Sequence, residues 1–462
     1  MLAKTVTGGV IRPGDARFVA LTRPENLRYY NPPSLPGGPV DPDAPFAVVR
    51  PRDPKEVAAT ILWAQEAGCR MVPRSGGHSY AGCSTVPGLV IHAESMRQVN
   101  YHAGSGLLEV GGGALNGDLF AALKRNNRSI VHGRCATVGV SAYMMGGGIG
   151  LAMREYGVGC DQVQSVELVL ANGRTVRAAA ANEYKDLFWA VRGGGGGNLA
   201  FATRWWLHTA PADKLIAFNA NWWPDAGGVR DIFRRLVRGL EASPEQMGAQ
   251  MSLYATSRDD TGPNRISLIG QYRGSLAQFQ KVFGNALSDA AQKTVLELPY
   301  WDAQEFFEID TAPNRYQETS LFADELSDAC IDKASELLRT LPGPAADARL
   351  TFFLTGGRIN KVKPDATAFV HRSSQWLINT ILEWRRNDEA TDYLTWQRQA
   401  QDAFSGILGG SSSYQNFPDP GLNNHAEVYW GANLPRLSRI KHVFDPKSVF
   451  TPPRHQEIPQ PV

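Results

Sequence analysis

Apolar and polar positions alternate in two different ways along the chain, and the change falls near residue 210. Before it, from about Pro45, short apolar runs alternate with short amphipathic segments, which is typical of mixed strands and helices. Strands are predicted over residues 46–51, 69–74, 89–93 and 106–112, and a hairpin over 163–180 with its turn at Asn172–Gly173. Helices are predicted over 54–68, where Asp53 and Glu56 sit at the cap and third positions, and over 117–127.

After His208–Lys214 the strands and helices become longer and more regular, so we place a domain boundary there. Strands of one sheet are predicted over residues 215–223, 249–257, 265–274, 350–357 and 369–384. Helices over 322–340 and 388–406 are predicted to cover one side of this sheet. The segment that follows residue 413 resembles neither half. The whole pattern predicts an α+β fold.

Length and charge narrow the class of protein. The 462 residues are 43% hydrophobic, which is enough to build two or three packed domains. The formal net charge is only +2, without a long block of one sign, so nucleic acid and anionic membranes are not expected partners. No apolar run reaches the ~18 residues that span a bilayer, and the N-terminus lacks a signal-peptide core. We expect a cytoplasmic protein that acts on a small molecule.

The five cysteines are too few and too scattered for a disulfide framework or a zinc site. Their number is odd, and no C-x-x-C pair occurs. We therefore predict no metal and interpret four of them as scattered thiols, namely Cys69, Cys83, Cys160 and Cys330. Cys135 is set apart by the motif around it.

Three glycine-rich clusters stand out in the first half: "RSGGHSYAG" (74–82), "GRCATVGVSAYMMGGGIG" (133–150) and "VRGGGGGNLAF" (191–201). Glycine is favoured where the backbone approaches a partner closely, and successive N–H groups in such loops bind phosphate. None of the clusters fits a P-loop or a Rossmann fingerprint. One such cluster is often an ordinary loop, but three together indicate an extended ligand that carries phosphate.

These clusters also carry a family resemblance. "RSGGHSY", "GRCATVGV", "GGGIGLAMREYGVGCDQV", "DLFWAVRGGGGGN", "YQNFPD" and "YWGANLPRLSRIKHVFDP" resemble, in this order, the motifs of the berberine bridge enzyme family of the vanillyl-alcohol oxidase superfamily. The resemblance extends from about Pro45 to Pro459. It implies a two-part FAD-binding domain, residues 1–210 (core about 41–210) plus a returning segment 410–462. The substrate domain, 211–409, would hold a large antiparallel sheet covered by helices.

The resemblance implies FAD attached at two points, His78 to the 8α-methyl group and Cys135 to C6 of the flavin. Imidazole and thiolate are suitable nucleophiles for an electron-poor ring. A loop histidine held by a neighbour, and attachment through His78 alone, remain the alternatives. The other residues that the resemblance assigns to the cofactor are Arg74, Ser75, Gly76, Gly77, Ser79, Tyr80, Gly82, Cys83, Val138, Gly139, Val140, Ser141, Gly147, Gly148, Gly150, Leu151, Asp161, Val163 and Asn416.

The resemblance also implies a catalytic base, Tyr414, in the family's Y-x-N motif with Asn416. A phenol with a pKa near ~10 needs nearby positive charge or hydrogen bonds to act as a base at pH 7. Tyr414 would take the hydroxyl proton while a hydride passes to flavin N5, and oxygen would regenerate the flavin and give hydrogen peroxide. The small side chain of Val140 favours access of oxygen. A tyrosine buried only for packing is the alternative.

Substrate contacts are less defined. Tyr143 stands where relatives often have a histidine, and Leu199–Ala200 replaces the usual Phe-Gly after Asn198. On the strand that resembles the family's substrate wall, the candidates are Trp376, Asn379 and Thr380. Four further aromatic residues could stack on a substrate or belong to the core: Trp222, Trp223, Trp301 and Tyr316.

The sequence thus predicts an FAD-dependent oxidase that acts on a carbohydrate or a secondary metabolite, with oxygen as acceptor. The alternatives are a flavoprotein dehydrogenase that uses another acceptor and a noncatalytic flavoprotein. A nucleotide-binding α/β protein without flavin is a third possibility.

Overall fold

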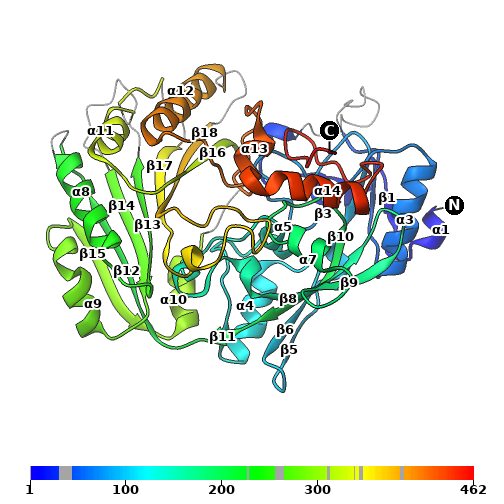
Figure 1. The fold of residues 1–462 in the computed structure, drawn as a ribbon, viewed down its shortest axis with the longest axis horizontal. Coiled ribbons are helices and arrows are strands. Elements are labelled where there is room, and N and C mark those ends of the chain that lie inside the picture. The colour runs from blue at the N-terminus through cyan, green and yellow to red at the C-terminus, as the bar shows by residue number, and fades with distance from the viewer. Residues whose placement is uncertain are drawn as a thin grey trace.

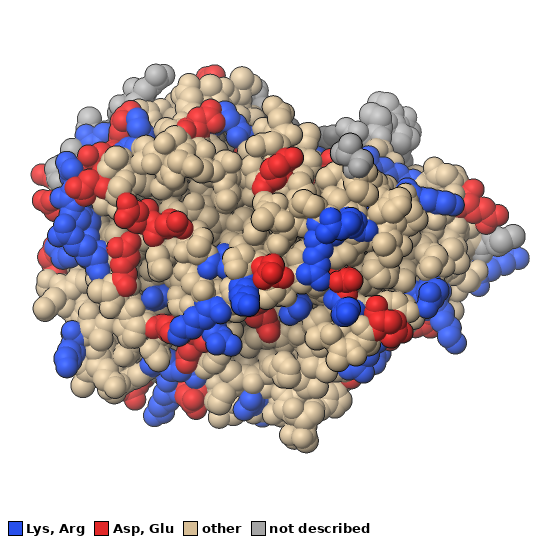
Figure 2. All heavy atoms as spheres, viewed as in Figure 1, with Lys and Arg blue, Asp and Glu red and all other residues tan. Residues whose placement is uncertain are grey.

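The computed structural model describes residues 2–30, 44–225, 228–254, 265–309, 313–337, 339–342, 347–384 and 390–461. Figure 1 shows two lobes side by side, with the C-terminal helices α13 and α14 lying on the lobe that contains the N-terminus. Basic and acidic side chains are interspersed over the face drawn in Figure 2, as the small net charge predicts. Among the described residues, no helix is both long and apolar enough to cross a membrane.

The first lobe begins with a four-stranded sheet in the order β1-β2-β4-β3. Its strands are β1 (Val10–Ile11), β2 (Ala47–Val49), β3 (Met71–Arg74) and β4 (Leu89–His92), of which only β1 is antiparallel to its neighbour. Helix α3 (Pro54–Glu66) starts as predicted, because the Asp53 carboxylate accepts the Glu56 N–H at 2.9 Å. The short helix α1 (Leu2–Thr5) precedes this sheet, and α2 (Phe18–Thr22) lies between β1 and β2 in the chain.

A five-stranded antiparallel sheet completes this lobe, in the order β5-β6-β10-β8-β9. The predicted hairpin is confirmed as β8 (Val163–Val169) and β9 (Thr175–Ala179). The other strands are β5 (Val99–His102), β6 (Leu107–Gly111) and β10 (Phe201–His208), and β7 (Arg128–Ser129) pairs with β11 (Ala210–Pro211). The helices are α4 (Asn116–Arg125), α5 (Val140–Met145), α6 (Met153–Tyr156) and α7 (Lys185–Ala190).

The second lobe is a seven-stranded antiparallel sheet, in the order β15-β12-β14-β13-β17-β18-β16. Its strands are β12 (Leu215–Trp222), β13 (Met247–Tyr254), β14 (Arg265–Tyr272), β15 (Gln292–Leu298), β16 (Arg315–Ala323), β17 (Asp347–Leu354) and β18 (Trp376–Trp384). An apolar core joins one face to α8 (Gly228–Glu241), α9 (Leu276–Phe283), α11 (Asp328–Leu337) and α12 (Ala390–Leu408). Helix α10 (Tyr300–Phe307) packs in the core of the first lobe.

Several predicted bounds in this lobe are wrong. Residues 322–323 end strand β16, and the helix begins only at Asp328. Strands β15 and β16 were not predicted, because both are edge strands: β15 is largely exposed, and β16 is rich in polar residues. Residues 369–375 form a loop before β18. Residues 255–257, 338 and 388–389 of the predicted elements lie outside the described part of the chain.

The chain returns to the first lobe at its C-terminal end. Side chains of α13 (His425–Trp430) and α14 (Leu434–Phe444) belong to the same core as β6, β8 and β10. Buried Lys441 of α14 fixes this contact, since its Nζ donates to the carbonyl oxygens of Asn198 and Phe450 and to the Asp445 carboxylate, each at 2.6 Å. The segment after residue 413 therefore lies beside the glycine-rich run 193–197.

Candidate active site

A cavity of about 430 Å³ opens where the first lobe meets the uncovered face of the seven-stranded sheet. Four parts of the chain wall it on the first-lobe side: the loop after β3, the segment around α5, the glycine run 193–197 and the C-terminal return. Strands β13, β16, β17 and β18 supply the opposite wall. All three glycine-rich clusters of the sequence thus meet at one place.

Glycine is required where two of these loops touch. A Cβ atom built on Gly76 would lie 2.5 Å from the backbone nitrogen of Gly139, and one on Gly139 would collide with Gly76. Gly77 adopts a φ of 78°, a left-handed conformation that other residues rarely take. The two loops therefore touch backbone to backbone and form a cradle along the cavity wall, and the side chain of Ser75 packs against Gly139.

Arg74 places a positive charge under this cradle. Its side chain is buried and donates to the carbonyl oxygens of Thr22 and Arg23 and to the Ser84 hydroxyl. Its Nε has no hydrogen-bond partner, and no carboxylate in the described residues forms an ion pair with it. Burial lowers the pKa of Arg74 to about 10, so the guanidinium stays protonated near neutral pH. An unpaired buried cation beside a glycine cradle suits a phosphate group.

His78 and Cys135 both line the cavity and converge on the hydroxyl group of Thr137. The Nε2 of His78 lies 2.7 Å, and the Sγ of Cys135 3.2 Å, from Oγ1 of Thr137. Burial, and secondarily the charge of Arg74, lowers the pKa of His78 to about 4. The imidazole is therefore neutral and nucleophilic at neutral pH. The structure brings together the two side chains that the resemblance names as attachment points.

Tyr414 is fully buried and lines the same cavity. Its phenolic oxygen accepts hydrogen bonds from the Gly148 N–H at 2.9 Å and from Nδ2 of Asn416 at 3.0 Å. These donors favour the phenolate, but burial opposes it more strongly and raises the pKa of Tyr414. Both lone pairs of the oxygen are thereby engaged, so its own proton is free to point elsewhere.

The sheet wall presents a row of polar side chains to the cavity. Glu318 of β16 is only 6% exposed, and its Oε2 accepts a hydrogen bond from Nδ2 of Asn379 at 3.1 Å. Burial, with a smaller contribution from Glu383, raises the pKa of Glu318 to about 8, although Arg349 and Asn379 act in the opposite direction. The buried Oδ1 of Asn379 has no hydrogen-bond partner. Both side chains can therefore still bond a polar ligand.

Arg134 lies next to Cys135 in the segment before α5, and its side chain extends to the sheet wall. Its guanidinium donates to the side chain of Gln250 on β13 at 2.9 Å. Burial, and secondarily the nearby Arg349, lowers its pKa to about 10. The hydroxyl groups of Ser252 on β13 and Thr351 on β17 form a 3.1 Å hydrogen bond between these adjacent strands.

Most of the predicted site residues line the cavity. They are Arg74, Ser75, Gly76, Gly77, His78, Ser79, Tyr80, Cys83, Cys135, Val138, Gly139, Ser141, Tyr143, Gly150, Leu151, Asn379, Tyr414 and Asn416. The hydroxyl of Tyr143 donates to the carbonyl of Ile149 at 2.9 Å, which fixes its ring against the wall. Four aromatic residues were predicted to contact the substrate or to belong to the core, and of these Tyr316 lines the cavity.

Eight predicted site residues lie outside the cavity lining: Gly82, Val140, Gly147, Gly148, Asp161, Val163, Trp376 and Thr380. Trp376 instead faces the helices and donates to Glu241 at 2.7 Å, and Val140 is buried in the first-lobe core. Asp161 forms a buried pair with Arg372, two hydrogen bonds of 2.7 Å. Trp376 and Asn379 are three positions apart on β18, so their side chains point to opposite faces of the sheet. Because Asn379 points into the cavity, Trp376 points away from it.

Sequence reasoning missed Glu318, Arg134, Arg349 and Gln250. Three of them lie on strands of the wall, and each strand comes from a different part of the chain. The one available signal was the polar content of residues 315–320, which is unusual for a strand next to an apolar core.

These residues fit FAD. The cradle and Arg74 would hold the phosphates, and His78 and Cys135 lie where a flavin ring could be attached. The matches with known proteins agree. The model described as "FAD binding domain" matches residues 45–179, and that described as "Berberine and berberine like" matches residues 413–455. The chain is an FAD-dependent oxidoreductase, and it is similar to berberine bridge enzyme-like proteins.

Similar proteins cover nearly the whole of this FAD-linked oxidoreductase. "Uncharacterized FAD-linked oxidoreductase YvdP" of Bacillus subtilis is 28% identical and covers 98% of each chain. Glucooligosaccharide oxidase of Sarocladium strictum is 26% identical, over 88% of this chain and 86% of its own. The solved structure of Physcomitrella patens BBE-like 1 is 26% identical, with a TM-score of 0.86 over 99% of this chain and 98% of that one.

Proposed function

We propose that this FAD-linked oxidoreductase is an oxidase that converts a hydroxyl-bearing carbon of a carbohydrate to a carbonyl group. One observation carries the proposal: Tyr414, His78, Cys135 and a polar sheet wall face a single cavity. A secondary metabolite with several hydroxyl groups is the alternative substrate class.

His78 and Cys135 hold the cofactor covalently in this proposal. Their common contact with Thr137 and the neutral imidazole of His78 support it. Thr137 can also take or return the proton that an attacking thiol or imidazole must exchange. When bound here, FAD supplies a two-electron acceptor that oxygen can reoxidise with release of hydrogen peroxide.

Tyr414 accepts the proton of the substrate hydroxyl in this scheme. The Gly148 N–H and Asn416 are aimed at its oxygen and stabilise the negative charge that develops there. Because burial raises the pKa of Tyr414, the phenol remains protonated in the resting protein. The phenol can take the substrate proton only after it has passed its own proton to a second acceptor in the cavity.

Glu318 is that second acceptor. Its carboxyl group faces the same cavity, and its pKa of about 8 lies close to the working range of a general base. Tyr80 lies near both groups, since its ionisation is influenced by Glu318 and by Tyr414. Asn379 orients the carboxylate through its 3.1 Å hydrogen bond.

The sheet wall favours a polyhydroxylated substrate. Arg134, Gln250, Glu318, Arg349 and Asn379 offer both donors and acceptors. An apolar aromatic substrate would leave the buried Oδ1 of Asn379 without a hydrogen-bond partner, at a cost of ~1–3 kcal/mol. Among the similar proteins, "Glucooligosaccharide oxidase" and "Carbohydrate oxidase" support the same choice by their names.

The test is a screen of oligosaccharides, monosaccharides and aromatic alcohols with detection of hydrogen peroxide. We expect peroxide from at least one carbohydrate, in proportion to the oxygen consumed. If substrate bleaches the flavin but oxygen does not restore it, the protein is a dehydrogenase. If no compound bleaches the flavin, it is a noncatalytic flavoprotein.

A further inference from the structure

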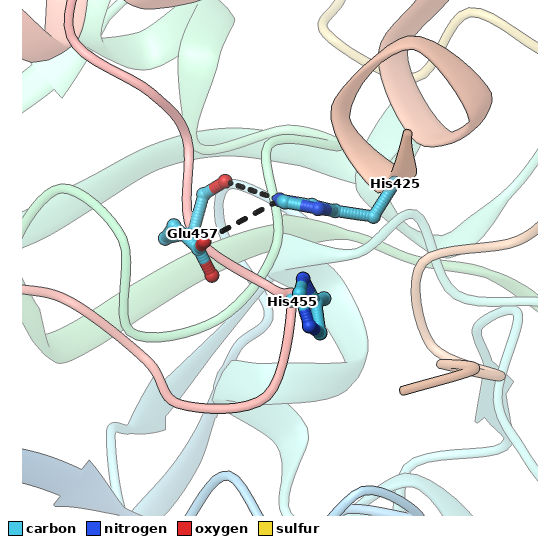
Figure 3. A group of neighbouring side chains, drawn as sticks. All are labelled: His425, His455 and Glu457. Atoms are coloured by element: carbon cyan, nitrogen blue, oxygen red, sulfur yellow. Dashed lines mark hydrogen bonds and ion pairs between the residues drawn. The ribbon is translucent and has the colours of Figure 1, made fainter. Parts of the chain in front are cut away.

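Three potential metal ligands lie together outside the cavity. They are His425, the first residue of α13, and His455 and Glu457 of the C-terminal tail. One donor atom of each lies within 4.8 Å of the other two. Figure 3 shows the three side chains grouped where the start of α13 meets the tail. None of them lines the cavity described above.

The backbone of the tail sets where these side chains point. Asn198 binds the C-terminal tail, residues 455–458, through two hydrogen bonds. Its Nδ2 donates to the Gln456 carbonyl at 2.9 Å, and its Oδ1 accepts the Ile458 N–H at 2.9 Å. The side chains of Gln456 and Ile458 are buried. Glu457, the residue between them, therefore faces the other side, toward α13, and His455 precedes this stretch in a turn with a φ of 59°.

His425 has the tautomer of a metal ligand. Its Nε2 lies 3.1 Å from the carbonyl oxygen of Glu457, which can only accept, so Nε2 carries the proton. Nδ1 then has a free lone pair, and it is buried without a hydrogen-bond partner. A ligating histidine usually donates its other ring N–H to a carbonyl or carboxylate in this way.

We propose that His425, His455 and Glu457 bind a zinc ion that fastens the C-terminal tail to α13. Two imidazoles and one carboxylate are a known ligand set for Zn²⁺, with water in the remaining position. Ligand atoms about 2.1 Å from a tetrahedral ion lie about 3.4 Å apart. Nε2 of His425 lies 3.8 Å from Oε1 of Glu457, so binding through Nδ1 would require His455 and Glu457, the two more exposed side chains, to rotate toward that atom.

The ion would act on the cofactor cavity through the tail. Gln456 lies between the two tail ligands and lines the cavity. A ligand that binds only the folded protein raises its stability, so zinc would hold the tail, and with it this part of the wall, in place. The site would be structural, because it lies outside the cavity that holds Tyr414.

The test uses the yellow holoprotein after dialysis against a chelator. Zn²⁺ is titrated by calorimetry, and Co²⁺ by its ligand-field absorption at wavelengths longer than those of the flavin. We expect one saturable equivalent, a four-coordinate cobalt spectrum and a higher melting temperature with zinc. His455→Ala and Glu457→Gln should each weaken binding by at least about a hundredfold, because even the loss of an outer partner costs about 10–100-fold.

His442→Ala is the matched control, because this exposed histidine of α14 contacts only Gln460 among the described residues. It should bind zinc as the unaltered protein does. Both exposed ligand variants are expected to fold, so a loss of binding can be separated from unfolding by the unchanged flavin spectrum. Absence of saturable binding, or equal binding by His455→Ala and His442→Ala, would overturn the proposal.

Discussion

Tyr414 and Gly148 are joined by a 2.9 Å hydrogen bond in which the backbone N–H of Gly148 donates to the phenolic oxygen. The two residues are 266 positions apart in the sequence, one in the C-terminal return and the other in the glycine-rich segment after α5. Asn416 adds a second donor at 3.0 Å. The phenol is therefore held in one orientation by groups that would stabilise its anion.

Replacement of Tyr414 by Phe removes this oxygen and keeps the ring. The rate of flavin reduction by substrate should fall about a hundred- to ten-thousand-fold, the usual contribution of a general base. Reoxidation by oxygen should hardly change, because it needs no substrate proton. Stopped-flow spectroscopy of the two half-reactions measures both effects.

Tyr429→Phe is the matched control for that experiment. Tyr429 is also buried and accepts a backbone N–H, that of Asp419, at 2.9 Å, but it does not line the cavity. Both variants should lose about 1–3 kcal/mol of stability, since each leaves an amide unpaired. Only Tyr414→Phe should slow reduction. Near-normal reduction in that variant would leave Tyr414 with a positioning role.

Glu318→Gln should change the pH dependence of flavin reduction. A base must be unprotonated to accept a proton, so the rate in the unaltered protein should rise as pH passes through about 8. The glutamine variant should lack this rise. Glu305→Gln, at an exposed pair with Lys124, should retain it. Identical pH profiles for all three proteins would remove Glu318 from the scheme.

The same substitution should also change stability in a pH-dependent way. Folding raises the pKa of Glu318 from 4.5 to about 8, so its contribution to the free energy of unfolding is greatest below pH 4.5. That contribution falls as pH rises toward 8, because over this range the carboxyl ionises in the unfolded chain but stays protonated in the folded protein. The stability of Glu318→Gln relative to the unaltered protein should therefore increase over this range. Urea unfolding at several pH values checks the sign.

Flavin attachment can be tested by acid precipitation. We expect the pellet to stay yellow in His78→Ala and in Cys135→Ala, because the other link remains, and to lose its colour only in the double variant. Cys69→Ala, at a thiol outside the cavity lining, should behave as the unaltered protein. A Cys135→Ala protein whose flavin-peptide mass is unaffected would exclude Cys135.

The Arg372–Asp161 pair should be important for stability. The Arg372 side chain is fully buried, so Arg372→Gln leaves a carboxylate without its partner and should cost about 3–5 kcal/mol. Arg97 makes an equally bidentate pair with Asp118 at 2.8 Å, but at the surface. Arg97→Gln should cost no more than ~1 kcal/mol. Urea denaturation compares the two, and equal losses would contradict this ranking.

The sequence by itself determined the features that depend on local chemistry. Asp53 and Pro54 start α3, Asn172–Gly173 turns the β8–β9 hairpin, and the glycine clusters mark the cofactor loops, because capping, turns and positive φ are properties of a few adjacent residues. The roles of His78, Cys135 and Tyr414 came instead from the family resemblance of the short motifs around them, and these roles stay predictions.

Only the tertiary structure decided which side chains share the cavity. Glu318 stands on an edge strand too polar to be predicted, and Asn379 rather than Trp376 faces the site because of the register between β16 and β18. The raised pKa of Glu318 and the lowered pKa of His78 arise from burial by segments distant in sequence. His425, His455 and Glu457 likewise meet only because Asn198 fixes the tail beside α13. Such contacts depend on how the strands pair and the lobes pack, and no short stretch of sequence encodes them.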